Sequence, residues 1–284
     1  INILRFQHSI KTLCRVLNVN RSTYYKHFKS TSSKRFDENQ TLKSQISDVY
    51  SKSKKRFGAY KIKQVLFTEY GSNISVGRVY RLMKSMNLPK MSTIKPKYHH
   101  TQTSDSNDFK NILNQKFNPS QPNQVWVSDI TYIRCNSKFV YLCVIIDLFA
   151  RKVIAYSLSS NIDTTLTLST LDKAYYVRNY PKNILFHSDR GVQYSSRDFR
   201  KKIDQLHFIQ SFSAKAHPYD NAVVESFFKF LKLEELNRKS FKTFREIELS
   251  LFEYINFYNN FRPHSANQWL TPQKKEDFFF DSLN

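Results

Sequence analysis

The chain has 284 residues, 40% of them hydrophobic and 15% aromatic, which is enough to bury a core in two domains or in one domain with a smaller module. Its net charge is +22, with +17 in residues 1–120 and +5 in residues 121–284. So large and uneven a positive charge predicts that the protein binds nucleic acid; the alternative is a protein that is basic without such a partner. The three cysteines lack metal-site spacing, which disfavours a cysteine-rich zinc module. The longest apolar run is too short to cross a bilayer, which disfavours a membrane protein. The sequence therefore predicts a cytoplasmic protein.

The first basic segment is predicted to be a pair of short helices. Between Ile10 and Leu17 the apolar residues recur at helical spacing, a turn follows at 18–20, and Ser22 is placed to cap a second helix. This pattern is typical of a helix-turn-helix, with a plain helical hairpin as the alternative. We therefore expect residues 1–36 to be a DNA-binding segment. Its predicted DNA contacts are Arg21 and Lys26.

Residues 37–88 are predicted to form a second helical, helix-turn-helix-like module. We expect helices over 39–51 and 59–70, the latter ending at Gly71, and a third between Ser75 and Pro89. The stretch "KSKKRFGAYK" lies between the first two and is placed to meet phosphates, with a solvated charge run as the alternative. The predicted DNA contacts of this module are Arg56, Lys61 and Arg78.

Residues 89–123 are polar and contain four prolines, so they are predicted to be a linker. From residue 124 the hydrophobic period changes to that of strands. The expected order is three strands, a helix, a strand, a helix, a strand and two final helices, which is the order of an RNase H-like α/β domain with a mixed five-stranded sheet. The expected strands are 125–133, 139–147, 152–159, 184–189 and 207–213, and the expected helices are 165–178, 196–206, 219–236 and 243–259.

Three carboxylates of this domain are candidates for phosphodiester chemistry. Asp129 lies in mid-strand, where a charge is costly unless it binds something, and Asp189 ends the fourth strand. In a sheet of order 3-2-1-4-5 the first and fourth strands are neighbours, so these two aspartates are expected side by side. Glu225 lies one helical turn after Asn221. Carboxylates that converge from separate elements are the ligands of a two-metal Mg²⁺ site.

Asp147 is a carboxylate that we expect to be structural. If Ile133 pairs with Phe139 across the first hairpin, Asp147 lies opposite Val125, about 13 Å along the strand from Asp129. That distance is too great for a shared metal pair, and an ion pair with Arg151 is the expected role of Asp147.

Basic residues surround these carboxylates in the sequence. Lys229 and Lys232 continue the helix face of Glu225, where they can hold substrate phosphate, and Arg190 follows Asp189 directly. A solvent-facing position is the alternative for Lys232 and for Arg190. His187 shares the strand face of Asp189, but a hard-oxygen site does not call for imidazole, so packing is its expected role.

Three stretches, "WVSDITYI", "HSDRGVQYSS" and "DNAVVESFFKFLK", resemble the DDE integrase-core transposases of the insertion-sequence-3 family, specifically their second-frame protein. The 35 residues between Asp189 and Glu225 match the spacing of that family, as does a lysine seven residues after the glutamate, Lys232. The ending "YINFYNNFRPHSANQWLTP" resembles the family's closing motif. The resemblance covers nearly the whole chain.

The resemblance implies an enzyme that cuts at the ends of an insertion sequence to free a 3′-OH, which then attacks another DNA strand. It implies Asp129, Asp189 and Glu225 as catalytic residues and metal ligands, with Mg²⁺ or, in substitution, Mn²⁺. It also implies double-stranded DNA as the partner, both as the terminal repeats of the element and as the target. It further implies a homo-oligomer on DNA and a location in the cytoplasm at the bacterial nucleoid. Finally, it implies fusion to a protein from an upstream frame, an expectation that the initial Ile fits. The competing hypotheses are a catalytically silent DNA-binding regulator or relic, and another RNase H-like nuclease such as a resolvase.

Overall fold

The computed structural model describes residues 1–28, 34–89, 109–214 and 218–283, and its contacts divide the chain into the units Ile1–Pro89 and Lys90–Asn284. In the first unit, α1 and α2 pack through Leu13, Cys14 and Tyr24. The Tyr24 amide donates to the Asn20 carbonyl, so α2 begins at Arg21 and Ser22 lies inside it, which corrects the predicted cap. These helices are α1 (Ile10–Val16) and α2 (Arg21–Phe28).

Helices α3, α4 and α5 form a bundle around Ile46, Ile62, Leu66 and Val79, all completely buried. Gly71 ends α4 in the left-handed region at φ +64°, as the sequence predicts. The predicted boundary between residues 36 and 37 falls inside α3. The bounds are α3 (Lys34–Lys52), α4 (Ala59–Tyr70) and α5 (Val76–Ser85).

The second unit is built on a mixed five-stranded sheet of order β3-β2-β1-β4-β5, which confirms the RNase H-like prediction. Strands β1, β2 and β3 are antiparallel neighbours, whereas β4 pairs in parallel with both β1 and β5. The strands are β1 (Val125–Cys135), β2 (Lys138–Asp147), β3 (Lys152–Ser159), β4 (Leu185–Ser188) and β5 (Ile209–Phe212).

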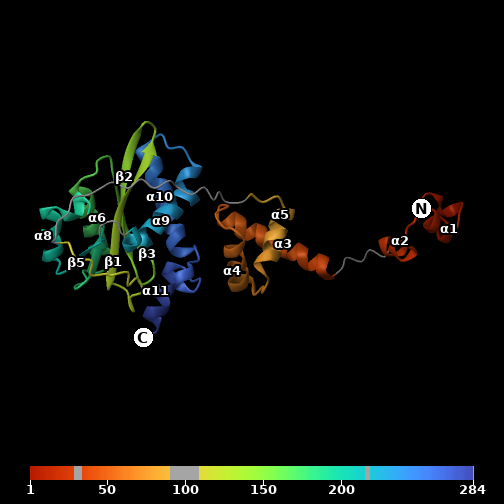
Figure 1. Ribbon diagram of the computed structural model, residues 1–284, viewed down its shortest axis with the longest axis horizontal. Coiled ribbons are helices and arrows are strands. Elements are labelled where there is room, and N and C mark those ends of the chain that lie inside the picture. The colour runs from red at the N-terminus through yellow and green to blue at the C-terminus, as the bar shows by residue number, and fades with distance from the viewer. Residues whose placement is uncertain (29–33, 90–108, 215–217, 284) are drawn as a thin grey trace. The chain divides into compact units, whose positions relative to one another are not determined.

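Helices cover both sides of this sheet, with α6 and α8 on one side and α9 and α10 on the other (Figure 1). Trp126, Phe186, Leu171 and Phe199 are completely buried in the core between the sheet and α6, α7 and α8. The helices are α6 (Thr164–Val177), α7 (Val192–Ser195), α8 (Arg197–Gln205), α9 (Ala222–Glu234), α10 (Phe244–Asn260) and α11 (Pro272–Asp281). Together these layers fix β1 and β4 at the centre of the domain.

The predicted register of the first hairpin is wrong by one residue. Strand β1 continues to Cys135, which pairs with Lys138, so only two residues form the turn and Asp147 lies opposite Trp126. Asn136 permits so short a turn because it takes a left-handed conformation at φ +55°, which asparagine adopts more readily than most residues.

Asp147 is structural, but its predicted partner is wrong. Its carboxylate accepts hydrogen bonds from the backbone N–H groups of Asn123 and Phe149 at 2.8 and 3.0 Å. It also lies 3.6 Å from the Arg178 guanidinium. Arg151 instead donates to the carbonyls of Phe117 and Leu148. Burial raises the pKa of Asp147, whereas Arg178 and the two backbone N–H groups lower it.

We expect Asp147→Asn to lower stability rather than chemistry. An amide cannot accept both charge-assisted bonds, and the change removes one of the two carboxylates that pair with Arg178, the other being Glu276. We expect a loss of roughly 2–4 kcal/mol. Thermal unfolding should show a Tm lower by roughly 4–12 °C, while DNA cleavage per folded molecule stays near the parent value. Asp172→Asn, which changes a half-exposed α6 carboxylate, is the control. A fully folded Asp147→Asn protein without cleavage activity would contradict the structural role.

The predicted linker, residues 89–123, is partly a piece of the unit that contains the sheet. Residues 90–108 lie outside the described residues, but 109–123 pack on the sheet: Leu113 is buried, and the amides of Ile112 and Leu113 donate to the Ser211 hydroxyl. The buried Asp220 carboxylate accepts from the side chains of Asn111 and Gln115. This segment is therefore ordered by polar contacts with residues about one hundred positions away.

Candidate active site

Asp129 and Asp189 lie side by side at the end of the short β1–β4 pairing. Val127 is the register partner of His187, and side chains two residues further on point to the same face of each strand. Asp129 is half-buried and Asp189 exposed at the strand end. Burial raises the pKa of Asp129 well above its ordinary value, and the charge of Asp189 raises it further. The two carboxylates therefore repel each other at close range.

Helix α9 runs along β1 and carries Glu225 to the same place. Near the start of α9, the side-chain amide of Asn221 donates to the Ser128 carbonyl at 3.3 Å. Near its end, the Lys232 ammonium lies 4.8 Å from the centre of the Tyr132 ring. The helix covers about 16 Å between these contacts and the strand about 13 Å, so the two run alongside each other. Glu225, one turn from Asn221, is thus beside Asp129, and its charge also raises the pKa of Asp129.

Hydrogen bonds behind the aspartates hold their backbone. The Tyr194 hydroxyl of α7 lies 2.7 Å from the Ser128 hydroxyl, which itself donates to the Val144 carbonyl. The segment after Asp189 is thereby tied to the residue before Asp129. At Gly191 an added Cβ would lie 3.0 Å from the Asp189 carboxylate, so the turn after Asp189 favours glycine for lack of space.

His187 is not placed as a ligand. Its ring is completely buried, and its Nδ1 and Nε2 atoms lie 2.9 and 3.2 Å from the hydroxyls of Ser211 and Ser213. Burial lowers the pKa of His187 to about 4, so the ring is neutral at physiological pH. It acts as packing beneath the strand end, as the sequence predicts.

The carboxylates suit a hard divalent cation by chemistry, since all three offer oxygen and their mutual repulsion is what such a cation relieves. Among the residues that the structure describes, no three His, Cys, Asp or Glu side chains are close enough to share one ion. At least one of the three carboxylate side chains would therefore have to shift for all of them to bind one ion.

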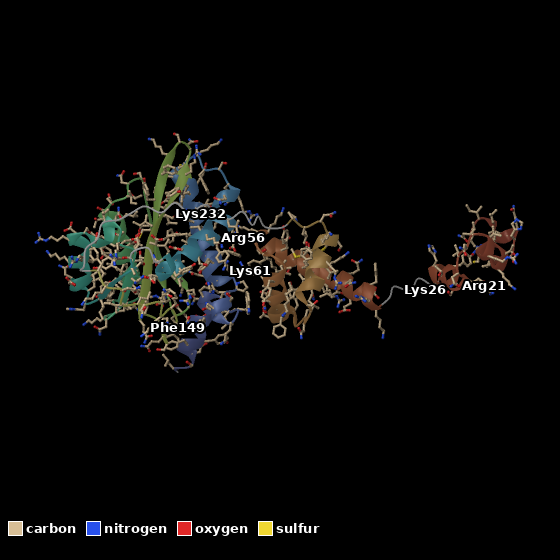
Figure 2. All side chains as sticks on the ribbon, viewed as in Figure 1. Arg21, Lys26, Arg56, Lys61, Phe149 and Lys232 are labelled. Carbon is tan, nitrogen blue, oxygen red and sulfur yellow. The ribbon has the colours of Figure 1, made fainter. Side chains whose placement is uncertain are left out.

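The predicted DNA contacts near this site divide into two kinds. Lys229 is exposed on α9. Lys232, labelled in Figure 2, is half-buried; burial lowers its pKa and the charge of Asp129 raises it. Arg190 instead donates to the carbonyls of Ser213 and Phe109, at 3.0 and 3.3 Å. Its structural role is to join the end of β4 to β5 and to the segment before β1.

In the helical unit, Arg21 and Lys26 are exposed on α2, as Figure 2 shows. The prediction of Arg56 as a surface contact is wrong, because its side chain is only 2% exposed. Arg78 donates hydrogen bonds to Glu38 and Asn39 and so joins α5 to α3. The Lys61 ammonium lies 5.5 Å from the centre of the Phe57 ring. A count of basic residues could not separate these internal roles from surface ones.

The sequence prediction also missed the residues that position the site. Asn221 lies directly before α9, yet its side chain makes no cap bond and reaches β1 instead. Tyr194 lies within "HSDRGVQY" and ties the loop to Ser128. The position of Asn221 one turn before Glu225 was the available signal, whereas nothing in the sequence pointed from Tyr194 to Ser128.

Family models agree with this architecture. Two models described as an integrase core domain match residues 119–218 and 207–272, and a model described as an HTH-like domain matches 37–98. The transposase InsF for insertion sequence IS3A of Escherichia coli (strain K12) is 34% identical over 279 residues, 95% of each chain. The chain belongs to the insertion-sequence-3 family of transposases. The transposase for element IS904 of Lactococcus lactis is 35% identical over 248 residues, covering 87% of this chain and 97% of that protein.

Solved structures similar to this transposase include the catalytic core domain of HTLV-2 integrase in complex with magnesium, 18% identical with a TM-score of 0.44 over 55% of this chain and 98% of that one. The catalytic domain of Mos1 mariner transposase is 16% identical, with a TM-score of 0.39 over 47% and 70%.

Family membership establishes the general activity. The chain is a DNA transposase with an integrase catalytic core, a metal-dependent polynucleotidyl transferase of the DDE type that binds DNA. Within the described parts of the chain, no helix is long and apolar enough to cross a membrane.

Proposed function

We propose that Asp129, Asp189 and Glu225 are the catalytic residues and metal ligands of this transposase, and that its metal is Mg²⁺, with Mn²⁺ as a substitute, in a two-ion site. The observation that carries the proposal is the position of Asp129, which lies beside Asp189 in the sheet. The charges of Asp189 and Glu225 raise the pKa of Asp129, and the charge of Lys232 lowers it. Bound divalent ions would activate the attacking oxygen and stabilise charge on the leaving one.

The protein's own residues have separate tasks in this proposal. Asp129 and Asp189 are carried by the sheet, and Glu225 is carried by α9. The charge of Asp129 raises the pKa of Lys232, and the task of Lys232 in this proposal is to contact the phosphate next to the one being cut. A catalytically silent regulator would need none of this arrangement, and no specific observation favours that alternative.

An end-cleavage assay tests the proposal. The full chain, given double-stranded DNA that carries the ends of its own element, should release 3′-OH ends and join them to another strand with Mg²⁺ or Mn²⁺. Neither product should form in EDTA or with Zn²⁺ alone, although DNA binding persists in EDTA. Equal cleavage with and without divalent metal would overturn the metal assignment.

The remaining partners are proposals of the same kind. We infer that the helical unit binds the terminal repeats, that the transposase works as a homo-oligomer on DNA at the bacterial nucleoid, and that a protein from an upstream frame can be fused to it. The charge of +17 on residues 1–120 and the HTH-like match support the first of these inferences.

Salt dependence should reveal the phosphate contacts of the helical unit. Because each phosphate contact releases counterions, we expect the affinity for end-bearing duplex to fall by roughly 10³–10⁵ between 50 and 200 mM salt if about 6–10 phosphates are engaged. Replacing Arg21 and Lys26 together by Gln should lower the slope of log affinity against log salt by about 1.8. An unchanged slope would remove these two residues from the interface.

A further inference from the structure

A groove continues from the candidate active site along the open edge of β1. Strand β4 pairs with β1 only as far as Val127, so beyond that residue this edge faces α9 and the segment 236–242. The groove has a volume of about 670 Å³ and lies between the end of the β1–β2 hairpin and the end of α9. Lys232 lines the groove, and the charge of Asp129 raises the pKa of the same ammonium, so one lysine adjoins both the groove and the carboxylates.

The charge of the groove suits a polyanion. Arg134, Lys232, Lys239 and Lys242 line it, and its described lining contains no Asp or Glu. Lys239 is paired with Glu235 outside the lining, and the Nε atom of Arg134 donates to the Asn136 carbonyl, which fixes the guanidinium at the hairpin end. Lys242 is exposed. The groove therefore offers four basic side chains and, among its described lining, no acidic one, which suits a phosphate backbone.

Two exposed aromatic rings distinguish this groove from an ordinary basic surface. Tyr132 is 59% exposed and Phe139 50% exposed, and their rings meet edge to face with centres 5.2 Å apart. Lys232 lies against the Tyr132 ring, yet much of that ring remains open to solvent. Large exposed rings beside cations are the usual means of binding unpaired bases, because a base inside a duplex is already stacked on its neighbours.

We propose that this groove holds a short unpaired stretch of the DNA strand that leaves the catalytic carboxylates, with a base stacked on Tyr132 and phosphates on Arg134 and Lys242. Tyr132 is three residues from Asp129 on the same strand, about 10 Å along it. Because side chains alternate between the two faces of a strand, the Tyr132 ring leaves β1 on the face opposite Asp129, and the DNA strand would pass around the edge of β1 to reach it. The inference rests on the proposed function, because the carboxylates define where that strand begins.

Binding of single-stranded DNA without catalysis tests the stacking. In EDTA, the anisotropy of a fluorescent oligothymidylate of about 12 nucleotides should report binding to the full chain. Tyr132→Ala should weaken this binding by roughly 5- to 150-fold, the loss of one base–aromatic stack, and Tyr132→Phe should bind like the parent. The control is Tyr176→Ala, which removes an exposed ring (69%) from α6. Equal binding by Tyr132→Ala and the parent would overturn the stacking role.

The phosphate contacts have their own test. Replacing Arg134 and Lys242 together by Gln should lower the salt slope for the oligothymidylate by about 1.4, whereas the same change at Arg200 and Lys201, exposed on α8, should leave it unaltered. Equal slopes in both double variants would overturn this part of the proposal.

The outcomes separate the groove from the active site. If the parent cleaves end-bearing DNA with Mg²⁺ but Tyr132→Ala binds oligothymidylate as tightly as the parent does, the groove inference alone fails. If the parent does not cleave while Tyr132→Ala still loses single-strand binding, the metal site fails and the groove stands. Loss of duplex binding equal to the loss of single-strand binding in Tyr132→Ala would identify the groove as a general phosphate surface and overturn the inference.

Discussion

Glu225→Gln is expected to abolish end cleavage while leaving DNA binding within about 2-fold of the parent. Glutamine keeps the shape of α9 but loses the charge that the proposed site needs for a divalent cation. A loss of about 4 kcal/mol of transition-state stabilisation corresponds to a rate lower by roughly 10³-fold. Single-turnover cleavage of end-bearing DNA in Mg²⁺ measures the rate, and a gel-shift titration in EDTA measures the binding.

The control for this change is Glu248→Gln, the same replacement at an exposed position of α10. It should cleave like the parent, which shows that losing one negative charge from the domain is harmless. Cleavage by Glu225→Gln at the rate of Glu248→Gln would remove Glu225 from the catalytic set. An unchanged Tm in both variants would show that the comparison concerns folded protein.

The central part of this site was predictable because it depends on strand order rather than on fine geometry. Asp129 lies within one strand and Asp189 directly follows another, and the order β3-β2-β1-β4-β5 makes those strands neighbours. The hairpin register was not predictable to one residue. A two-residue and a longer turn both suit "RCNSK", and only the pairing of Cys135 with Lys138 decides between them.

Polar contacts over long sequence distances explain the other differences. Residues 109–123 look like a linker because prolines and amides dominate them, yet Asn111 and Gln115 bind the buried Asp220 carboxylate. In the same way, Arg178 lies about thirty residues beyond Asp147 but replaces the nearby Arg151 as its partner. Hydrophobic periodicity carries no information about such partners, since it reports only which face of an element is buried.

The buried ion pair of Glu234 and Arg262 gives the largest expected effect on stability. Glu234 ends α9, and its carboxylate accepts from Arg262 Nε at 2.9 Å, from Arg262 Nη2 at 2.9 Å and from the Tyr254 hydroxyl at 3.0 Å. Neither Glu234 nor Arg262 is more than 2% exposed. Through this pair the closing motif of the sequence is fastened to the helix that carries Glu225.

We expect Arg262→Ala to destabilise the catalytic domain by roughly 3–5 kcal/mol, because it leaves the Glu234 charge buried without its partner. The double variant Arg262→Met with Glu234→Met should be more stable than Arg262→Ala, since no charge then remains buried. The control is Lys202→Ala, which breaks the partly exposed pair with Asp172 and should cost no more than about 1 kcal/mol. Urea unfolding measures all three. A free energy of unfolding for Arg262→Ala equal to that of Lys202→Ala would mean that α9, and Glu225 with it, is held by apolar packing alone.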